Sequence, residues 1–170
     1  MILVSACLLG EDCKYDGGNN ETEEIRVLFD EEELISVCPE RLGGLTIPRP
    51  PAEIQNGTGE DVLQNQAEVR DKEGQDLTDE FLAGARQTLE KAVANDCKLA
   101  IFKARSPSCG TEEIYDGSFS GEQKEGVGVT TALLERAGIR VFNEDNLMKV
   151  KEAKEELENE YSSVPTRDPS

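Results

Sequence analysis

Four short apolar runs, spaced along the chain, constrain its fold more than any other feature of the sequence. Each run is apolar on both faces, which is typical of strands buried within a parallel sheet. We therefore predict one mainly parallel sheet in a Rossmann-like layer. The runs are Ile2–Ala6, Leu34–Val37, Leu99–Phe102 and Ile139–Phe142.

Segments with helical periodicity lie between these runs. A helix is predicted from Thr78, as its cap, to about Asn95. A second begins at Thr130 or Thr131 and ends near Gly138. Shorter helical patterns cover 23–29 and follow residue 143. Strands that alternate with helices predict an α/β fold with helices flanking the sheet. The first helix is expected to bury Phe81, Leu82, Ala85, Leu89 and Val93.

The domain organisation is simple. The chain has 170 residues, a length that fits one domain. We predict a single domain over residues 1–150, with 151–170 forming a helix end and a polar, disordered tail from about Ser162. The polar section from Gln55 to Leu77 is expected to contain a small exposed hairpin, with Ala67–Arg70 as one arm.

The chain shows no sign of membrane insertion or export. No apolar segment is long enough to span a bilayer, and the apolar N-terminus lacks the basic region of a signal peptide. A cytoplasmic location is therefore expected, where the five cysteines would be reduced or bound to metal.

Charge and histidine content restrict the possible functions. The 36 acidic and 18 basic residues give a net charge of -18, which argues against binding of intact nucleic acid. A small anionic ligand remains compatible with this charge. The chain has no histidine, so serine–histidine and cysteine–histidine nucleophiles are excluded. Thiolates or carboxylates must hold any metal, and Glu or Asp is the expected base.

Three cysteines are expected to meet at one edge of the sheet. Cys7 and Cys38 follow the first two predicted strands, and Cys109 follows the third. Carboxyl ends of parallel strands share one edge, where ligands bind. Three thiolates with one open position suit zinc or a 4Fe–4S cluster with one unligated iron. Cys13 is close enough in sequence to reach this site, whereas Cys97 precedes the third strand and is expected at the opposite edge.

Several other side chains are candidates for the site. Glu40, two residues after Cys38, is the preferred base. Arg49 can contact an anionic ligand, and Glu53 is expected to bond a loop amide.

The second half of the chain holds two serine hydroxyls, a lysine and a glycine-rich turn that are also candidates for the site. Ser106 and Ser108 place two hydroxyls near Cys109. Lys103 would be costly to bury alone and is expected to reach solvent or pair with a carboxylate. Gly126 and Gly128 precede a helix start, where backbone amides can bind an anion.

Seven sequence stretches together resemble the thiouracil desulfidase (TudS) family over about residues 2–144. They are Ile2–Gly10, Tyr15–Gly17, Val37–Glu40 with Gly43-Gly44, Pro48–Glu53, Ser106–Gly110, Ile114–Gly117 and Gly128–Thr130. The chain departs from this pattern at Thr46-Ile47, where members often have Pro-Thr.

The resemblance implies a 4Fe–4S cluster held by Cys7, Cys38 and Cys109, with the fourth iron free to take the sulfur of the substrate. The family's glutamate corresponds to Glu40, and its serine to Ser106, with Ser108 as the alternative. The implied substrates are 4-thiouracil and 4-thio-UMP, salvaged from thiolated tRNA.

Our hypothesis is a desulfuration without electron transfer. Glu40 deprotonates a water that Ser106 helps to place, the water adds to C4 of the ring, and hydrogen sulfide leaves. The expected substrate-binding residues are Tyr15, Arg49, Lys103, Gly126 and Gly128. Two alternatives remain open. One is a zinc-binding structural domain, and the other is an electron or sulfur carrier with Cys13 as a fourth cluster ligand.

Overall fold

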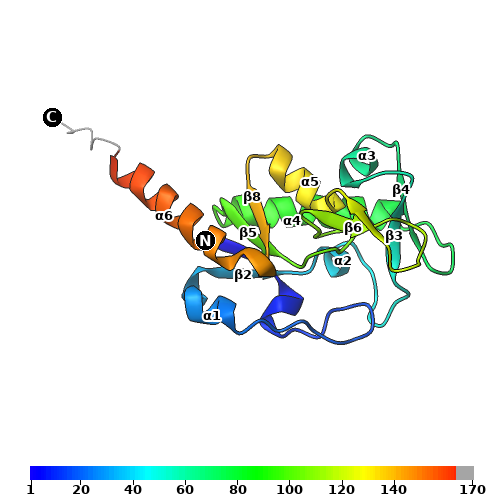
Figure 1. Cartoon of the computed structure of the whole chain (residues 1–170), viewed down its shortest axis with the longest axis horizontal. Coiled ribbons are helices and arrows are strands. Elements are labelled where there is room, and N and C mark those ends of the chain that lie inside the picture. Colours follow the sequence, from blue (N-terminus) through cyan, green and yellow to red (C-terminus); the bar gives the residue numbers. More distant parts are fainter. Residues whose placement is uncertain (164–170) are drawn as a thin grey trace.

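All four predicted runs form one parallel sheet in the computed structural model, which describes residues 1–163 (Figure 1). The sheet order is β2-β1-β5-β8, with every neighbouring pair parallel. Strand β8 begins one residue later than predicted and ends at Asn143. The fold class is therefore confirmed. The strands are β1 (Ile2–Ser5), β2 (Leu34–Val37), β5 (Leu99–Phe102) and β8 (Arg140–Asn143).

Helices cover both faces of this sheet. One face packs against α1 (Glu24–Leu28) and α6 (Leu147–Ser163), and the other against α4 (Thr78–Ala94) and α5 (Val129–Arg136). Alternation along each strand creates the two cores, because successive side chains point to opposite faces. Val4 and Ile101 belong to the first core, and Leu3 and Phe102 to the second.

A second group of elements lies beyond the carboxyl ends of the strands, on the right of Figure 1. Its antiparallel pairs are β3 (Ala52–Gln55) with β4 (Glu68–Asp71), and β6 (Glu113–Tyr115) with β7 (Gln123–Glu125). The short helix α3 (Gly59–Leu63) connects β3 to β4.

The prediction of an exposed hairpin around Ala67–Arg70 is partly wrong. The antiparallel pairing exists, but Ile54 and Val69 are 1% and 0% exposed and pack with Leu77 and Phe81 of a third core. One face of the ribbon is therefore buried beneath α4. The polar composition of this section hid its core, because only alternate residues of each strand face inward.

Helix α4 differs from its prediction in two details. Thr78 is its first residue rather than its cap, and both its backbone N–H and its hydroxyl donate to Asp76 Oδ1. Val93 was expected in the core but is 69% exposed. The buried stripe instead follows the helical repeat, which turns position 93 toward solvent. The buried residues are Phe81, Gly84, Ala85, Thr88 and Ala92.

The short helix α2 (Pro39–Leu42) lies directly against α4 at two glycines. A Cβ added to Gly84 would lie 2.0 Å from the carbonyl oxygen of Pro39, and one added to Gly43 would lie 2.0 Å from that of Glu80. Glycine permits this contact between backbones because it has no side chain. The contact positions the segment that carries Cys38 and Glu40.

Three short 3-10 helices complete the described chain: η1 (Ala6–Leu9), η2 (Glu31–Glu33) and η3 (Glu144–Asn146). Among the helices of residues 1–163, none has both the length and the apolar character needed to cross a bilayer. Helix α6 includes Ser162 and Ser163, where the tail was predicted to begin. The rest of that predicted tail lies outside the described residues.

Candidate active site

Cys7, Cys38 and Cys109 lie at the carboxyl edge of the sheet, as the strand order predicts. Cys7 lies in η1 after β1, Cys38 lies between β2 and α2, and Cys109 follows β5. Cys7 and Cys38 are half-buried, whereas Cys109 is 4% exposed, and all five cysteines are free thiols. Cys97 precedes β5 and is buried in a core cluster.

Each of these three sulfur atoms has polar neighbours. The side chain of Asn20 hydrogen-bonds Cys7, and the backbone N–H of Arg41 donates to Cys38. The Ser108 hydroxyl lies 3.5 Å from Cys109 Sγ. Such contacts orient metal ligands and stabilise the charge of a thiolate. Burial nevertheless raises the pKa of the Cys109 thiol, so this residue requires a cation to become a thiolate readily.

Cys13 also belongs to the site. Its side chain is 2% exposed and forms hydrogen bonds with the thiols of both Cys7 and Cys38. These contacts lower the pKa of Cys7, and they lower that of Cys38 to about 7. The same contacts, with burial, raise the pKa of Cys13. Cys13 is therefore the thiol that retains its proton while its two neighbours ionise.

Arg49 holds Glu40 in place. Arg49 Nε lies 3.4 Å from Glu40 Oε1, and its side chain is only 6% exposed. Its other two nitrogens donate to the carbonyl oxygens of Thr46, at 3.1 Å, and Cys13, at 3.0 Å. All three nitrogens of this guanidinium thus bond protein oxygens, and the predicted contact of Arg49 with an anionic ligand stays a prediction.

The two candidate serines form one chain of hydrogen bonds with Glu40. Ser106 Oγ accepts from the backbone N–H groups of Ser108, at 3.2 Å, and Cys109, at 3.1 Å. These two bonds occupy both lone pairs of the Ser106 hydroxyl, so its hydrogen points to Ser108 Oγ, 2.9 Å away. Ser108 Oγ in turn donates to Glu40 Oε2 at 3.2 Å. The chain therefore runs in one direction, from Ser106 through Ser108 to Glu40.

Lys103 has a carboxylate partner that the sequence did not reveal. Its Nζ lies 2.9 Å from Glu144 Oε2, and the two side chains are 26% and 14% exposed. Glu144 also accepts the backbone N–H of Ala104 at 2.7 Å. The charge of Lys103 lies close enough to Cys7 to favour its thiolate. Lys103 thus pairs with a carboxylate, one of the two situations expected for it.

The predicted anion site at Gly126 and Gly128 does not form. The N–H of Gly126 donates to Glu112, and that of Gly128 to Gly110. The first amides of α5 are also occupied, because they donate to the carbonyls of Pro107 and Ser108. This end of α5 therefore fixes the loop that carries Cys109 and leaves these amides with no capacity for an anion.

Two further predicted residues have clear positions. Tyr15 is 44% exposed, and its carbonyl oxygen accepts the Arg49 N–H at 2.8 Å, which joins its loop to the Arg49 loop. Glu53 accepts the N–H groups of Gly117, at 3.0 Å, and Phe119, at 3.2 Å, so its predicted structural role is confirmed.

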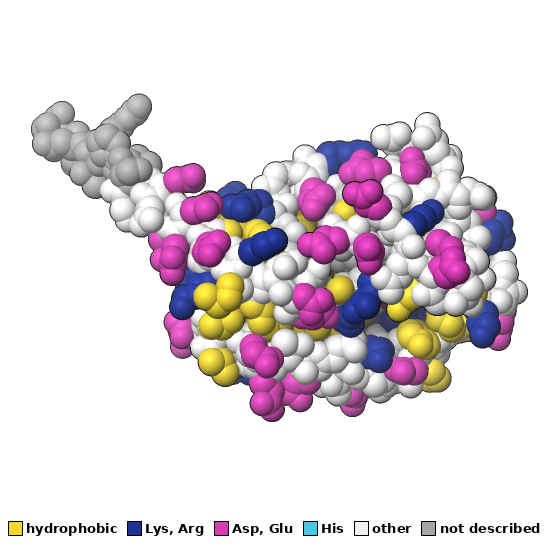
Figure 2. Space-filling model, in the orientation of Figure 1, with side chains coloured by type: hydrophobic (Ala, Val, Ile, Leu, Met, Phe, Trp, Pro, Cys, Tyr) yellow, Lys and Arg dark blue, Asp and Glu magenta, His cyan; other side chains and the backbone are white. Residues whose placement is uncertain are grey.

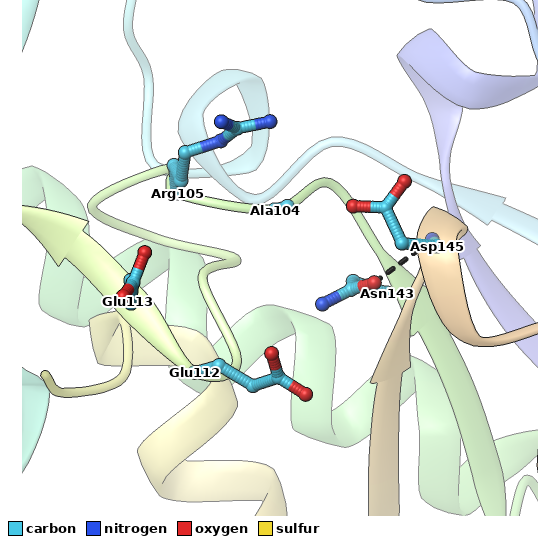
Figure 3. Close-up of a pocket in the computed structure, with 6 residues that line it drawn as sticks. All are labelled: Ala104, Arg105, Glu112, Glu113, Asn143 and Asp145. Atoms are coloured by element: carbon cyan, nitrogen blue, oxygen red, sulfur yellow. Dashed lines mark hydrogen bonds between the residues drawn. The ribbon is translucent and has the colours of Figure 1, made fainter.

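A polar pocket opens between Ala104 and Asn143 at this edge of the sheet (Figure 3). In Figure 3 the guanidinium of Arg105 points away from the carboxylate of Glu112. None of the predicted catalytic or cluster-binding residues lines this pocket. Its lining residues are Ala104, Arg105, Glu112, Glu113, Asn143 and Asp145.

The donor chemistry of the site fits an iron–sulfur cluster. Iron–sulfur clusters are held by cysteine thiolates, and second-shell hydrogen bonds to the sulfurs tune them. Three half-buried or buried thiols with such bonds meet this requirement. Within residues 1–163, no group of three or more Cys, Asp or Glu side chains is arranged to hold a single metal ion.

Sequence reasoning missed three contributors to this edge. Asn20 contacts Cys7, Glu144 pairs with Lys103, and the Ser5 hydroxyl contacts Cys109 while it accepts the Lys103 N–H. Only Ser5 carried a signal, since it ends a strand that points to the site. Asn20 and Glu144 reach the site because of the conformation of the loops that carry them, and hydrophobic periodicity does not predict loop conformation.

Comparisons with known proteins found a matching family and similar sequences and structures. The model of a family described as 2-thiouracil desulfurase matches residues 2–146. An uncharacterised protein of Bacillus subtilis (strain 168), YbbK, is 48% identical over 147 residues, which are 86% of this chain and 97% of that protein. A solved structure described as a 4Fe–4S-dependent thiouracil desulfidase, TudS, is similar with a TM-score of 0.81 and 41% identity. That similarity covers 91% of this chain and 97% of the solved one.

Proposed function

The chain belongs to the 2-thiouracil desulfurase family, and we propose on that basis that it removes sulfur from a thiolated uracil. The cofactor of this reaction is a 4Fe–4S cluster held by Cys7, Cys38 and Cys109. One observation carries the proposal: these three thiols share an edge with a directed hydrogen-bond chain that ends on a carboxylate. The proposed catalytic domain covers residues 1–150.

The reaction exchanges sulfur for oxygen without electron transfer. Water adds to the carbon of the thiocarbonyl group, the carbon–sulfur bond breaks, and hydrogen sulfide leaves. The substrate and water together hold all the atoms of uracil and hydrogen sulfide, so no external oxidant or reductant is needed. When bound, the cluster supplies an iron without a cysteine ligand, a soft Lewis acid suited to the sulfur of the substrate.

The residues of this chain handle the proton of the water. Glu40 takes a proton from the water as the water adds to the ring. The chain of hydrogen bonds from Ser106 through Ser108 holds Glu40 Oε2 in place for this step. Ser108 is 2% exposed, whereas Ser106 is only half-buried. Ser106 is therefore the more accessible hydroxyl, and Ser108 links it to Glu40.

Arg49 acts as a positioning residue for the Glu40 carboxylate. It touches Glu40 Oε1, which leaves Oε2 directed to Ser108. Because Arg49 is itself fixed by two carbonyl oxygens, the carboxylate has little freedom to rotate away. A shift of the reacting groups by about 1 Å costs on the order of a hundredfold in rate.

We further infer that the substrate is a small molecule, 4-thiouracil or its nucleotide 4-thio-UMP, in the salvage of thiolated tRNA in the cytoplasm. Asp and Glu side chains are spread over the face in Figure 2, which favours a small ligand over a nucleic-acid backbone. The exposed ring of Tyr15 offers a surface for stacking a base. Lys103 keeps a role in substrate binding through its charge beside the cysteines.

Cys13 gives a second function some support. Its contacts with Cys7 and Cys38 place a fourth thiol where it can complete the ligand set of a cluster. Such a cluster would have no open iron and would suit an electron or sulfur carrier.

The proposed function is tested by turnover without oxygen. Protein with a reconstituted cluster is incubated with 4-thiouracil or 4-thio-UMP, with no reductant beyond what keeps thiols reduced. We expect sulfide and uracil or UMP to appear in equal amounts. A protein that carries its cluster but releases no sulfide from either compound would refute the desulfidase and favour the carrier.

A further inference from the structure

Cys13 is a buried thiol that the proposed mechanism does not use. Its side chain is 2% exposed, and it touches the thiols of Cys7 and Cys38. Its carbonyl oxygen accepts from Arg49 Nη2 at 3.0 Å. Since Arg49 also bonds Glu40 in α2, one guanidinium ties the Cys13 loop to the helix that directly follows Cys38.

We propose that Cys13 and Cys38 form a site of reversible oxidation, in which Cys13 captures Cys38 as a disulfide when peroxide reaches the site. This inference rests on the proposed role of Cys38 as a cluster ligand. Its chemical product can be measured whether or not the protein desulfurates thiouracil.

The reaction balances with hydrogen peroxide as the only oxidant. Cys38 sulfur attacks peroxide, the oxygen–oxygen bond breaks, and a sulfenic acid and one water form. Cys13 sulfur then attacks Cys38 sulfur, and the hydroxyl group leaves as a second water with the Cys13 proton. Two electrons pass from the pair of sulfurs to peroxide. A thiol reductant reverses the change by thiol–disulfide exchange.

The geometry favours Cys38 as the partner. Cys38 Sγ lies 4.0 Å from the Cys13 carbonyl oxygen, so the sulfur lies against the Cys13 backbone as well as its thiol. Cys38 is half-buried and accessible to a small oxidant, whereas Cys13 lies deeper and can act only on a neighbour. Arg49 bonds both the Cys13 carbonyl and Glu40, so it holds the Cys13 loop against the segment that carries Cys38.

The arrangement protects a ligand from irreversible damage. A sulfenic acid with no nearby thiol is oxidised further to sulfinic acid, which thiols do not reverse. A disulfide protects the Cys38 sulfur from this further oxidation. It also prevents cluster binding until the disulfide is reduced. Cys13 would thus make the loss of the cluster in oxidising conditions repairable.

The test follows the cysteines by peptide mapping. Cluster-loaded protein is treated with hydrogen peroxide, free thiols are alkylated, and peptides are identified by mass spectrometry without reduction. We expect a peptide pair linking Cys13 to Cys38 in the wild type and in Cys97→Ser, the control for loss of a buried cysteine remote from the site. In Cys13→Ser we expect Cys38 to be found as sulfinic acid. After reduction with dithiothreitol and reconstitution, this variant should recover little of its cluster, whereas the wild type should recover nearly all of it.

Two results would overturn the proposal. One is a wild-type protein whose Cys38 is sulfinic acid, or is linked to Cys7, with Cys13 still free. The other is a Cys13→Ser variant whose cluster is rebuilt as fully as that of the wild type. The wild-type map is informative even if Cys13→Ser does not fold.

Discussion

Replacing Gly84 with alanine should damage activity more than stability. The new Cβ would lie 2.0 Å from the Pro39 carbonyl oxygen, and separations below 3.0 Å are essentially never seen. The difference, 3.0 minus 2.0, requires α2 and α4 to move apart by about 1 Å at this point. Because α2 carries Glu40 and begins after Cys38, the movement displaces both from Ser108 and the other cysteines.

The expected loss of stability in Gly84→Ala is smaller than the expected loss of catalytic rate. Overpacking costs about 1–3 kcal/mol, and the higher helix propensity of alanine returns about 1 kcal/mol. A net loss of about 0–2 kcal/mol in unfolding free energy is expected. A displacement of about 1 Å at the reacting groups costs on the order of a hundredfold in rate, or about 2.7 kcal/mol. The Glu40 Oε2–Ser108 Oγ contact, now 3.2 Å, has no slack to absorb it.

Two assays with one control measure this difference. Urea unfolding gives the stability, and sulfide release from 4-thiouracil gives the rate. Gln87→Ala lies on an exposed part of the same helix and should change stability by less than about 0.5 kcal/mol with full turnover. If Gly84→Ala matched Gln87→Ala in both assays, the contact between α2 and α4 would not position the site as argued.

Three further predictions concern single side chains. Glu40→Gln should keep the brown cluster but slow sulfide release by about 100- to 10,000-fold, because the amide accepts no proton; normal turnover would remove Glu40 from the mechanism. Ser108→Ala and Ser106→Ala should each slow turnover, and combining them should cost little more than either alone, because both hold Glu40 through one hydrogen-bond chain; fully additive losses in the double variant would contradict this shared action. Lys154→Met should lower stability by less than about 1 kcal/mol at neutral pH, since Lys154 Nζ lies 2.7 Å from Glu33 Oε1. The bond with Glu33 raises the pKa of Lys154, so its stabilisation is fully present below the unfolded pKa near 10.5 and disappears as pH rises through the folded value. Urea unfolding of the wild type and Lys154→Met at pH 7, and again above the folded pKa of Lys154, tests this prediction. A difference in unfolding free energy that increased with pH would contradict it.

The parallel sheet could be predicted because its strands are buried on both faces. Runs such as Leu99–Phe102 leave a continuous apolar signal, and strand order then places Cys7, Cys38 and Cys109 at one edge. The small antiparallel pairs could not be found in this way. Strand β7 reads Gln123–Glu125, three polar residues defined by pairing with β6 rather than by periodicity.

The details of the site depend on loop paths that sequence patterns do not record. Nothing in the spacing of Arg49 indicates that its guanidinium would be buried against Glu40 and the Cys13 carbonyl. The choice between Ser106 and Ser108 likewise required hydrogen-bond geometry, since both lie in the same turn beside Cys109. Gly126 and Gly128 matched an anion-binding pattern, but their amides bond the carbonyls of neighbouring loops.

We propose that three particular thiols, those of Cys7, Cys38 and Cys109, hold the cluster at which sulfur is removed. The most direct test is the iron and acid-labile sulfide content of five single variants, with each cysteine replaced by alanine and reconstituted without oxygen. We predict nearly complete loss of both in the Cys7, Cys38 and Cys109 variants, and near wild-type content in the Cys13 and Cys97 variants. A Cys13→Ala protein without a cluster, or a Cys109→Ala protein with a full one, would contradict the assignment.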